Sequence, residues 1–474
     1  MSLQKRELIV LNRWTLRMGI KEARFILLFT LLLTSLCFAA GIATPLETTR
    51  AELLQQSANA SSITEFDVNG LKVLVKQRTA SQTVAAGLFI RGGSSNITAQ
   101  DAGIEALMLA TAVEASEKYP RARMRDELAR LGSDLGSGVN YDYSALTLAS
   151  TRANFDRSFD IFTNVILHPL FDKQDFDLVK NRLIVSLSDD QDTPDSYLQN
   201  LQNAVAYTGH PYANDPDGTP ASMSRLGLED VRNYHKKIME TSRLLLVIVG
   251  DLNPQDLKGK IAETLGKLPG GNYQPVQPPT LKFDTSTVGV TSRSLPTNYV
   301  NGFFVAPSLT SPDIYPMRIA GSILRDRIFD EVRAKRNLSY APDAFLRSQG
   351  SNVGGLYVTA VDANQAVGLM LNEITRLQTE PVTPQLITSI VAQFLTNYYL
   401  GQETNSAQAG ELGRFELIGG GWRKSQEFFD RLRAVTPADI ERVARTYMRN
   451  IRFVVLGDPS KIDRSVFTRS TSIN

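Results

Sequence analysis

The chain contains 474 residues, more than one hydrophobic core usually supports, so two or more domains are expected. Its composition, 42% hydrophobic and 21% charged, is that of a globular protein. The net charge of +2 and the absence of a Lys/Arg run give no basic footprint of the kind that nucleic acid requires, so we expect no nucleic-acid partner.

The first 43 residues have the pattern of a secretory signal peptide or a membrane anchor. Basic residues precede the apolar run Phe25–Ala40, and the small residues Gly41 and Ala43 follow it. The run is near the lower length limit of a membrane-spanning helix, so cleavage and anchoring both stay open, as does a start at Met18. We expect an exported chain, periplasmic or membrane-anchored, with its folded domains outside the cytoplasm.

Residues 44–62 are polar, which predicts a tether between the leader and the folded part of the chain. The folded part is expected to begin at Ile63. Asn-Gly within Phe66–Gln77 predicts a β-hairpin, and Val84–Gly93 a strand. Thr98 with Asp101 resembles a capping box, so a buried helix should begin near Ala99 and end before Pro120. Further elements are expected at the helix Arg121–Gly132, the helical stripes that begin at Phe155 and Phe176, and the buried strand Arg243–Leu252.

The segment 267–280 contains four prolines and two glycines and therefore predicts a linker between domains 63–266 and 281–474. The sequence then repeats itself. Leu228–Leu252 is echoed by Pro437–Pro459, each a helix followed by an apolar strand that ends in Gly-Asp, 207 residues apart. This duplication predicts an α/β (α+β) fold of two homologous domains, each a mixed β-sheet flanked by helices.

Candidate metal ligands are few. Cys37 is the only cysteine and lies in the leader. The three histidines His168, His210 and His235 are far apart, whereas a zinc-binding helix presents two histidines one turn apart. We interpret all three as structural or surface residues and expect no cofactor.

The segment from Arg91 to Ala112, together with "HPY" at 210–212, "EDVRNYH" at 229–235 and "LLLVIVGDL" at 244–252, resembles the pitrilysin/insulinase-type (inverzincin) peptidases. The two-subunit branch that includes the mitochondrial processing peptidase is the most similar. The resemblance covers about residues 63–462.

In that family the zinc motif H-x-x-E-H lies on the helix expected after Gly103. The resemblance places the two histidines at Ala106 and Ala110, the catalytic glutamate at Leu109 and the third ligand at about Ser186. None of the four positions carries the family's residue. Glu105 and Glu114 remain near the helix, and we interpret both as solvated or capping residues.

Two further regions resemble substrate-binding parts of the family. Gly136-Ser137 occupies an expected edge strand where active members carry Asn-Ala. This departure weakens the prediction that this domain binds substrate. Ile328–Phe345 resembles the second-domain signature, in which an arginine and a tyrosine, here Arg333 and Tyr340, reach the opposing active site. Their positive charge and hydroxyl suit a developing oxyanion.

The resemblance implies a non-catalytic subunit, inactive alone, of a heteromeric zinc metallopeptidase. A homologous partner with H-x-x-E-H would cleave the peptide, and this chain would close the chamber and contribute Arg333 and Tyr340. The alternatives are a peptide-binding or scaffold protein without an associated enzyme, and an enzyme with a relocated metal site.

Overall fold

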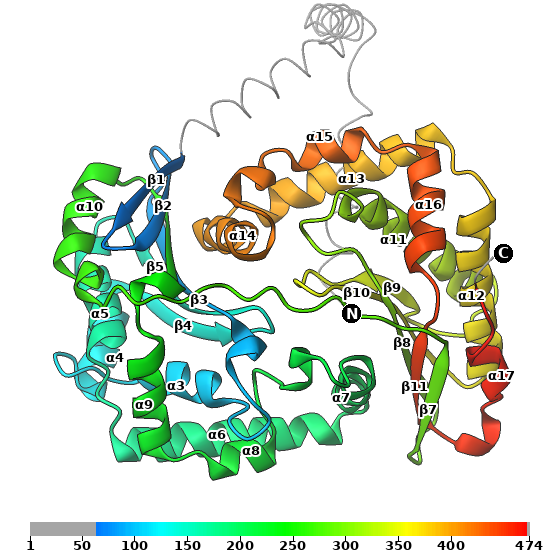
Figure 1. Ribbon diagram of the computed structural model, residues 1–474, viewed down its shortest axis with the longest axis horizontal. Helices are drawn as coiled ribbons and strands as arrows, with labels where there is room; N and C mark the ends of the chain where they lie inside the picture. Colours follow the sequence, from blue (N-terminus) through cyan, green and yellow to red (C-terminus); the bar gives the residue numbers. More distant parts are fainter. Residues whose placement is uncertain (1–62, 472–474) are drawn as a thin grey trace, which may run out of the picture. The chain divides into compact units, whose positions relative to one another are not determined.

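The computed structural model describes residues 63–471, which fall in one compact unit with two β-sheets (Figure 1). The leader 1–43 and the whole tether 44–62 lie outside the described residues. The first sheet has the strand order β1-β2-β6-β3-β5-β4. Its strands are β1 (Ile63–Val68), β2 (Leu71–Gln77), β3 (Thr83–Arg91), β4 (Asp134–Val139), β5 (Tyr143–Thr151) and β6 (Leu244–Gly250).

The second sheet repeats the topology of the first and supports the duplication that the sequence predicted. Its order is β7-β11-β8-β10-β9, and β11 runs parallel to β7 as β6 runs parallel to β2. All other neighbours in both sheets are antiparallel. The strands are β7 (Thr287–Ser292), β8 (Asn298–Val305), β9 (Asp343–Leu346), β10 (Val353–Ala360) and β11 (Arg452–Gly457).

The predicted hairpin is confirmed as β1 and β2. Asn69 and Gly70 have φ angles of 52° and 82°, the left-handed geometry that a two-residue turn requires and that glycine adopts without strain. The Asp67 carboxylate accepts a hydrogen bond of 2.8 Å from the Gly70 N–H and closes the turn.

The first sheet is buried on both faces. Leu244, Leu246 and Ile248 of β6 face one core, and Leu245 and Val247 face another, as the two-residue period of a strand requires. The first core is covered by helices of the same half. They are α3 (Ile104–Ala112), α4 (Arg121–Leu131), α5 (Phe155–Leu167), α6 (Lys173–Asp192), α8 (Pro220–Arg225), α9 (Leu228–Ile238) and α10 (Pro254–Glu263).

The second sheet is covered on one face by helices of the second half (Figure 1). They are α11 (Ile314–Ile328), α12 (Ala363–Thr379), α13 (Pro384–Gly401), α15 (Phe428–Arg433), α16 (Pro437–Tyr447) and α17 (Arg464–Phe467).

Each sheet receives its remaining cover from the other half of the chain. Helix α14 (Asn405–Ile418) packs on β3 and β6 with the buried residues Ala409 and Leu412 (Figure 1). Helix α7 (Pro194–Ala206) packs on β8 and β11, where Leu198 contacts Val454 and Leu456. The halves therefore exchange helices and share cores.

Polar contacts surround the α14 interface. Lys72 of β2 forms an ion pair of 2.6 Å with Glu416, and the indole N–H of Trp422 donates to Glu65 at 2.8 Å. Trp422 is buried beneath this contact. At the other end of α14, the Asn405 amide donates to the Thr83 carbonyl at 2.6 Å. The docked helix is thus held by an apolar centre and a polar rim.

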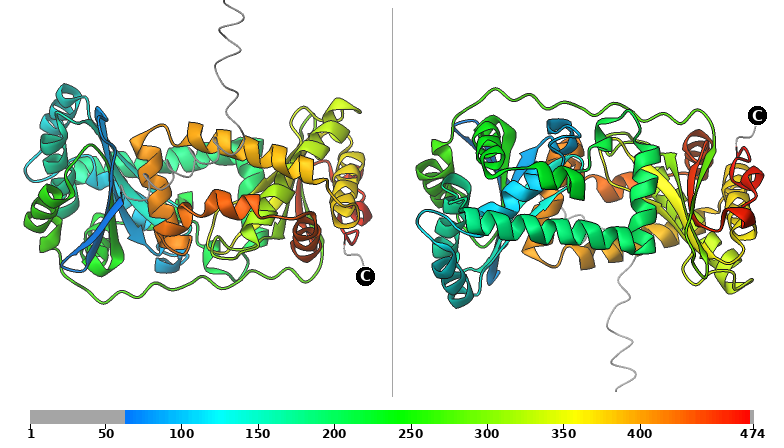
Figure 2. Two further views of the ribbon diagram at one scale, coloured as in Figure 1. Left: turned by 90° about the horizontal axis from the view of Figure 1, so that it is seen from above. Right: turned by 90° about the horizontal axis from the view of Figure 1, so that it is seen from below.

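The chain from 269 to 286 forms neither helix nor strand and runs along one side of the molecule between the sheets (Figure 2).

His210 contacts this segment. Its Nε2 lies 2.8 Å from the Pro279 carbonyl, which can only accept a hydrogen bond, so this nitrogen carries the proton. Nδ1 accepts from the Tyr212 N–H at 3.1 Å, and burial lowers the pKa of His210. His210 is therefore a structural residue, as expected.

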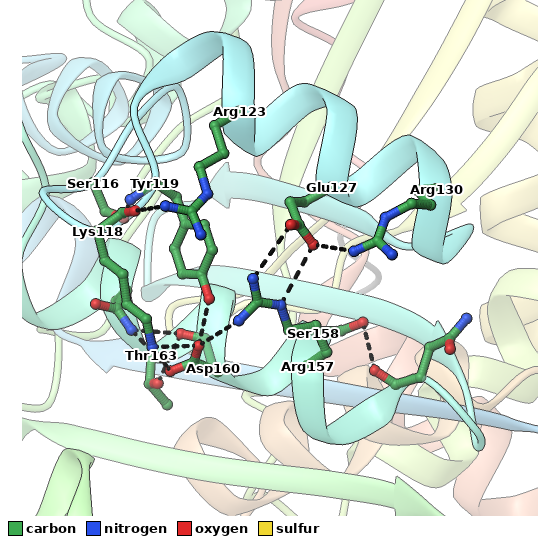
Figure 3. A network of polar contacts seen from close by, with 12 residues as sticks. Ser116, Lys118, Tyr119, Arg123, Glu127, Arg130, Arg157, Ser158, Asp160 and Thr163 are labelled. Atoms are coloured by element: carbon green, nitrogen blue, oxygen red, sulfur yellow. Dashed lines mark hydrogen bonds and ion pairs between the residues drawn. The ribbon is translucent and has the colours of Figure 1, made fainter.

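The segment after α3 is anchored by Tyr119, whose ring has no exposed surface (Figure 3). Its hydroxyl donates to Asp160 at 2.5 Å, and the cations of Lys118, Arg123 and Arg157 lie 5.1–5.5 Å from its ring centre. Burial and Asp160 raise the pKa of Tyr119 to about 12. This network ties the turn before α4 to α5.

Candidate functional site

Helix α3 begins at Ile104, later than the Ala99 that the sequence predicted. The hydroxyl of Thr98 donates to Asp101 at 2.6 Å, and this local pair closes a turn before the helix. The helix is preceded by Gly103 with φ 89°, where a Cβ atom would lie 2.8 Å from Met223 Cε and 3.0 Å from the Asp217 carbonyl. Close packing against the 217–218 loop thus fixes where α3 begins.

The three motif positions on α3 have different environments. Leu109 has no exposed surface and belongs to the main core of the first half. Ala106 and Ala110 are half-buried, and α3 packs against α6. The buried helix is confirmed over Ile104–Ala112, although it ends earlier than the predicted boundary at Pro120. At the position of the catalytic glutamate it carries a buried leucine.

Ser186, the fourth position, is exposed on α6. It lines a cavity of about 480 Å³ between α6, α7 and the loop 212–220. That volume is within the range of ligand-binding cavities. The structure therefore retains space beside the third-ligand position.

Carboxylates, which the sequence analysis did not single out, line the same cavity: Asp190, Asp215 and Asp217. Desolvation raises the pKa of Asp217 to about 6, with Asp215 adding to the shift, although part of the Asp217 side chain reaches solvent. Desolvation also raises the pKa of Asp215. The sequence "NDPDG" at 214–218 marks a turn, and only the fold brings that turn to α6.

Zinc, which the family resemblance implies, does not fit these residues. Alanine and leucine offer no ligand atom, and Ser186 offers one hydroxyl. Between residues 63 and 471, no group of three or more histidine, cysteine, aspartate or glutamate side chains is placed to hold a metal ion. His235 is buried, and its Nε2 lies 2.9 Å from the Ile166 carbonyl, which gives it a structural role.

The interpretation of Glu105 and Glu114 as solvated or capping residues was wrong. Glu105 is 3% exposed and accepts a hydrogen bond of 2.7 Å from the Tyr234 hydroxyl. Burial raises the pKa of Glu105 more than the hydrogen bond from Tyr234 and other nearby polar groups lower it. Tyr234 lies 129 residues away, so no local pattern indicated this contact.

Glu114 is also largely shielded from solvent. Its carboxylate forms ion pairs with Arg125 at 3.1 Å, Arg121 at 3.4 Å and Arg182 at 3.5 Å. These contacts join the segment after α3 to α4 and α6, so Glu114 holds helices together.

The strand that carries Gly136 and Ser137 is β4, and it lies at the edge of the first sheet. Its pairing with β5 sets Gly136 opposite Thr147, and α3 contacts the same strand. The open side of β4 is where an extended peptide could add by backbone hydrogen bonds.

Arg333 lies in η7, a single π-helical turn (Phe329–Ala334) that follows α11. The structure brings it to Tyr340, with the guanidinium 4.2 Å from the Tyr340 ring centre and 5.0 Å from that of Phe329. Tyr340 is 78% exposed. The two predicted residues thus form one cationic and aromatic cluster, in which Arg333 is half-buried and Tyr340 is exposed.

Comparison with known proteins identifies the scaffold. The family model "Insulinase (Peptidase family M16)" matches residues 72–218, and "Peptidase M16 inactive domain" matches residues 225–394. The chain belongs to the M16 peptidase family. The family resemblance and the α/β fold are confirmed.

The chain is 19% identical over 402 residues to an uncharacterized zinc protease of Rickettsia felis, covering 83% of this chain and 97% of that protein. It is 22% identical over 393 residues to a probable mitochondrial-processing peptidase subunit alpha of Schizosaccharomyces pombe, covering 76% of each. A protease structure from Helicobacter pylori superimposes with a TM-score of 0.77 at 16% identity, covering 84% of this chain and 99% of that one. The last likeness shows the fold.

Proposed function

We propose that this M16 chain is the non-catalytic member of a two-chain zinc peptidase. A homologous partner carrying H-x-x-E-H would perform the hydrolysis, and this chain would complete the chamber that holds the peptide. The observation that carries the proposal is α3, which is retained and packed while all four chemical positions are replaced.

Two structural features support a role in binding and enclosing a peptide. The edge strand β4 offers unpaired backbone groups, and the cavity beside Ser186 has the volume of a ligand site. The similarity to a protein described as a processing-peptidase subunit supports a role as one member of a pair.

Arg333 and Tyr340 would act on the peptide carbonyl that the partner attacks. A guanidinium attracts the negative oxygen, and a phenol hydroxyl donates to it without adding charge. The exposure of Tyr340 leaves its hydroxyl free to reach a bound peptide or a neighbouring chain.

The test is the activity of the reconstituted pair. We expect Tyr340→Phe to lower kcat with little change in KM, and Arg333→Ala to affect both, because a charge attracts ground state and transition state alike. Loss of an oxyanion donor typically costs about 10²–10³ in kcat. Arg336→Ala removes a nearby exposed charge that pairs with Glu331 and is the matched control.

Unchanged kinetics for both variants in an assembled pair would favour the alternative, a scaffold or peptide-binding protein that contributes shape alone. Sizing of the complex is needed beside the kinetics, because a variant that no longer assembles would lose activity for another reason.

We also propose export, on the basis of the basic residues and apolar run before residue 43. Within residues 63–471, no helix has the length and hydropathy needed to span a bilayer. Mass spectrometry of the mature protein tests the proposal. A start near Gly41–Pro45 indicates cleavage and an intact Phe25–Ala40 indicates an anchor, whereas cytosolic protein with an intact leader would refute export.

A further inference from the structure

A second, smaller cavity lies where α11, α14 and α15 meet. Arg318 of α11 and Arg414 of α14 line it, together with the aromatic rings of Tyr315, Phe415 and Phe428. Its volume is about 10 Å³, enough for one water-sized group. A single carboxylate oxygen is of that size.

The two arginines contact aromatic rings but no carboxylate of the described residues: the Arg318 guanidinium lies 5.5 Å from the Phe428 ring centre and that of Arg414 lies 5.1 Å from the Phe415 ring centre. Nε of Arg318 is buried without a hydrogen-bond partner, and its one side-chain hydrogen bond goes to the Ser348 hydroxyl at 3.4 Å. Neither Arg318 nor Arg414 forms an ion pair with any described residue. Arg121, by contrast, pairs with Asp175 at 2.7 Å.

The surroundings do not balance this charge. Glu411, one turn before Arg414 on α14, is the carboxylate that interacts with Lys76, Arg318 and Arg414, three cations against one anion. Burial raises the pKa of Glu411. Burial and the charge of Arg414 lower the pKa of Arg318 to about 10.

We propose that this cavity receives one oxygen of a ligand's carboxylate group, with Arg318 and Arg414 as its donors. A shielded guanidinium without an anionic partner is costly, and charge-assisted hydrogen bonds to a carboxylate relieve that cost. The carboxylate has two sources in a peptide, an acidic side chain and the free C-terminus. The site stands on the unpaired charges and does not require a catalytic partner, so it is tested with this chain alone.

The first measurement is the thermal unfolding midpoint of the full chain in sodium acetate and in sodium chloride at equal ionic strength. We expect acetate to raise the midpoint saturably. Arg318→Gln and Arg414→Gln should each weaken the apparent affinity for acetate about tenfold or more, the usual effect of losing a charged hydrogen bond. Glu411→Gln should strengthen it, because it removes the competing anion.

Arg325→Gln is the matched control, since Arg325 is exposed on the same helix and its loss changes the net charge equally. If Arg318→Gln fails to fold, Arg414→Gln decides. The absence of an acetate-specific shift in the wild type, or an equal shift in the wild type and Arg414→Gln, would overturn the proposal.

Calorimetry with three alanine peptides identifies the source. One is acetylated and amidated, the second carries an internal glutamate between the same caps, and the third has a free C-terminal carboxylate. Binding of the second or the third, lost in Arg414→Gln, names the recognised group. Binding of the fully neutral peptide with equal affinity would contradict recognition of a carboxylate.

Discussion

Restoring the family's zinc motif should cost stability mainly at one of its four positions, Leu109. The other three positions should accept zinc ligands with a smaller loss of stability. The two histidines would replace the half-buried Ala106 and Ala110, and a glutamate at Ser186 would be exposed beside the cavity. Leu109 has no exposed surface, so Leu109→Glu places a carboxyl group in a packed core.

The expected cost of Leu109→Glu follows from that burial. Removing a fully buried leucine side chain costs about 1.5–3 kcal/mol, and a buried polar group without a partner adds about 1–3 kcal/mol. The sum, about 2.5–6 kcal/mol, is a large share of the 5–15 kcal/mol by which folded proteins are usually stable. Leu109→Met, which nearly conserves volume, should cost less than about 1.5 kcal/mol.

The assay is urea unfolding of each variant, with zinc content after equilibrium dialysis. We expect Ala106→His/Ala110→His/Ser186→Glu to take up zinc with a smaller loss of stability than Leu109→Glu alone. A Leu109→Glu protein with the same urea midpoint as the wild type would refute the reasoning, because it would show that position 109 faces solvent.

Three other predictions concern the packing around α3 and α14. Burial raises the pKa of Glu105, so the unfolding free energy should fall as pH rises from about 4.5 through the folded pKa. Urea unfolding of Glu105→Gln should show no such fall, and a variant with the wild-type pH profile would contradict this prediction. Tyr119→Phe removes the hydrogen bond to Asp160 and should lower the unfolding free energy by about 1–2 kcal/mol, measured by urea denaturation, whereas an unaltered midpoint would show the network to be dispensable. Residues 63–266 expressed alone should aggregate, as measured by size-exclusion chromatography, because the apolar sheet face that α14 covers would be exposed. Co-expression with residues 281–474 should restore solubility, whereas a stable monomer would count against cores shared between the two halves.

Local patterns predicted the elements whose stabilising contacts are also local. The Asn69-Gly70 turn determined the first hairpin, and Gly132, with φ 60°, ends α4 as the sequence indicated. The repeat at Leu228 and Pro437 is confirmed as α9–β6 and α16–β11. In each case the signal lies within a few residues of the structure that it determines.

The features that the sequence did not predict depend on contacts between distant segments. The start of α3 depends on the 217–218 loop, and the burial of Glu105 depends on Tyr234. The exchange of α7 and α14 joins residues such as Lys72 and Glu416, which are 344 positions apart. The family resemblance pointed to Ala106, Leu109, Ala110 and Ser186, but only the fold shows that Leu109 lies in the core while Ser186 lines a cavity.

The most direct test of the central claim is purification of the native protein with metal analysis of what accompanies it. We predict a second chain in equal amount that carries H-x-x-E-H, about one zinc ion per pair, and peptidase activity that disappears when the two chains are separated. Recovery of this chain alone with one equivalent of zinc and chelator-sensitive activity would contradict the account.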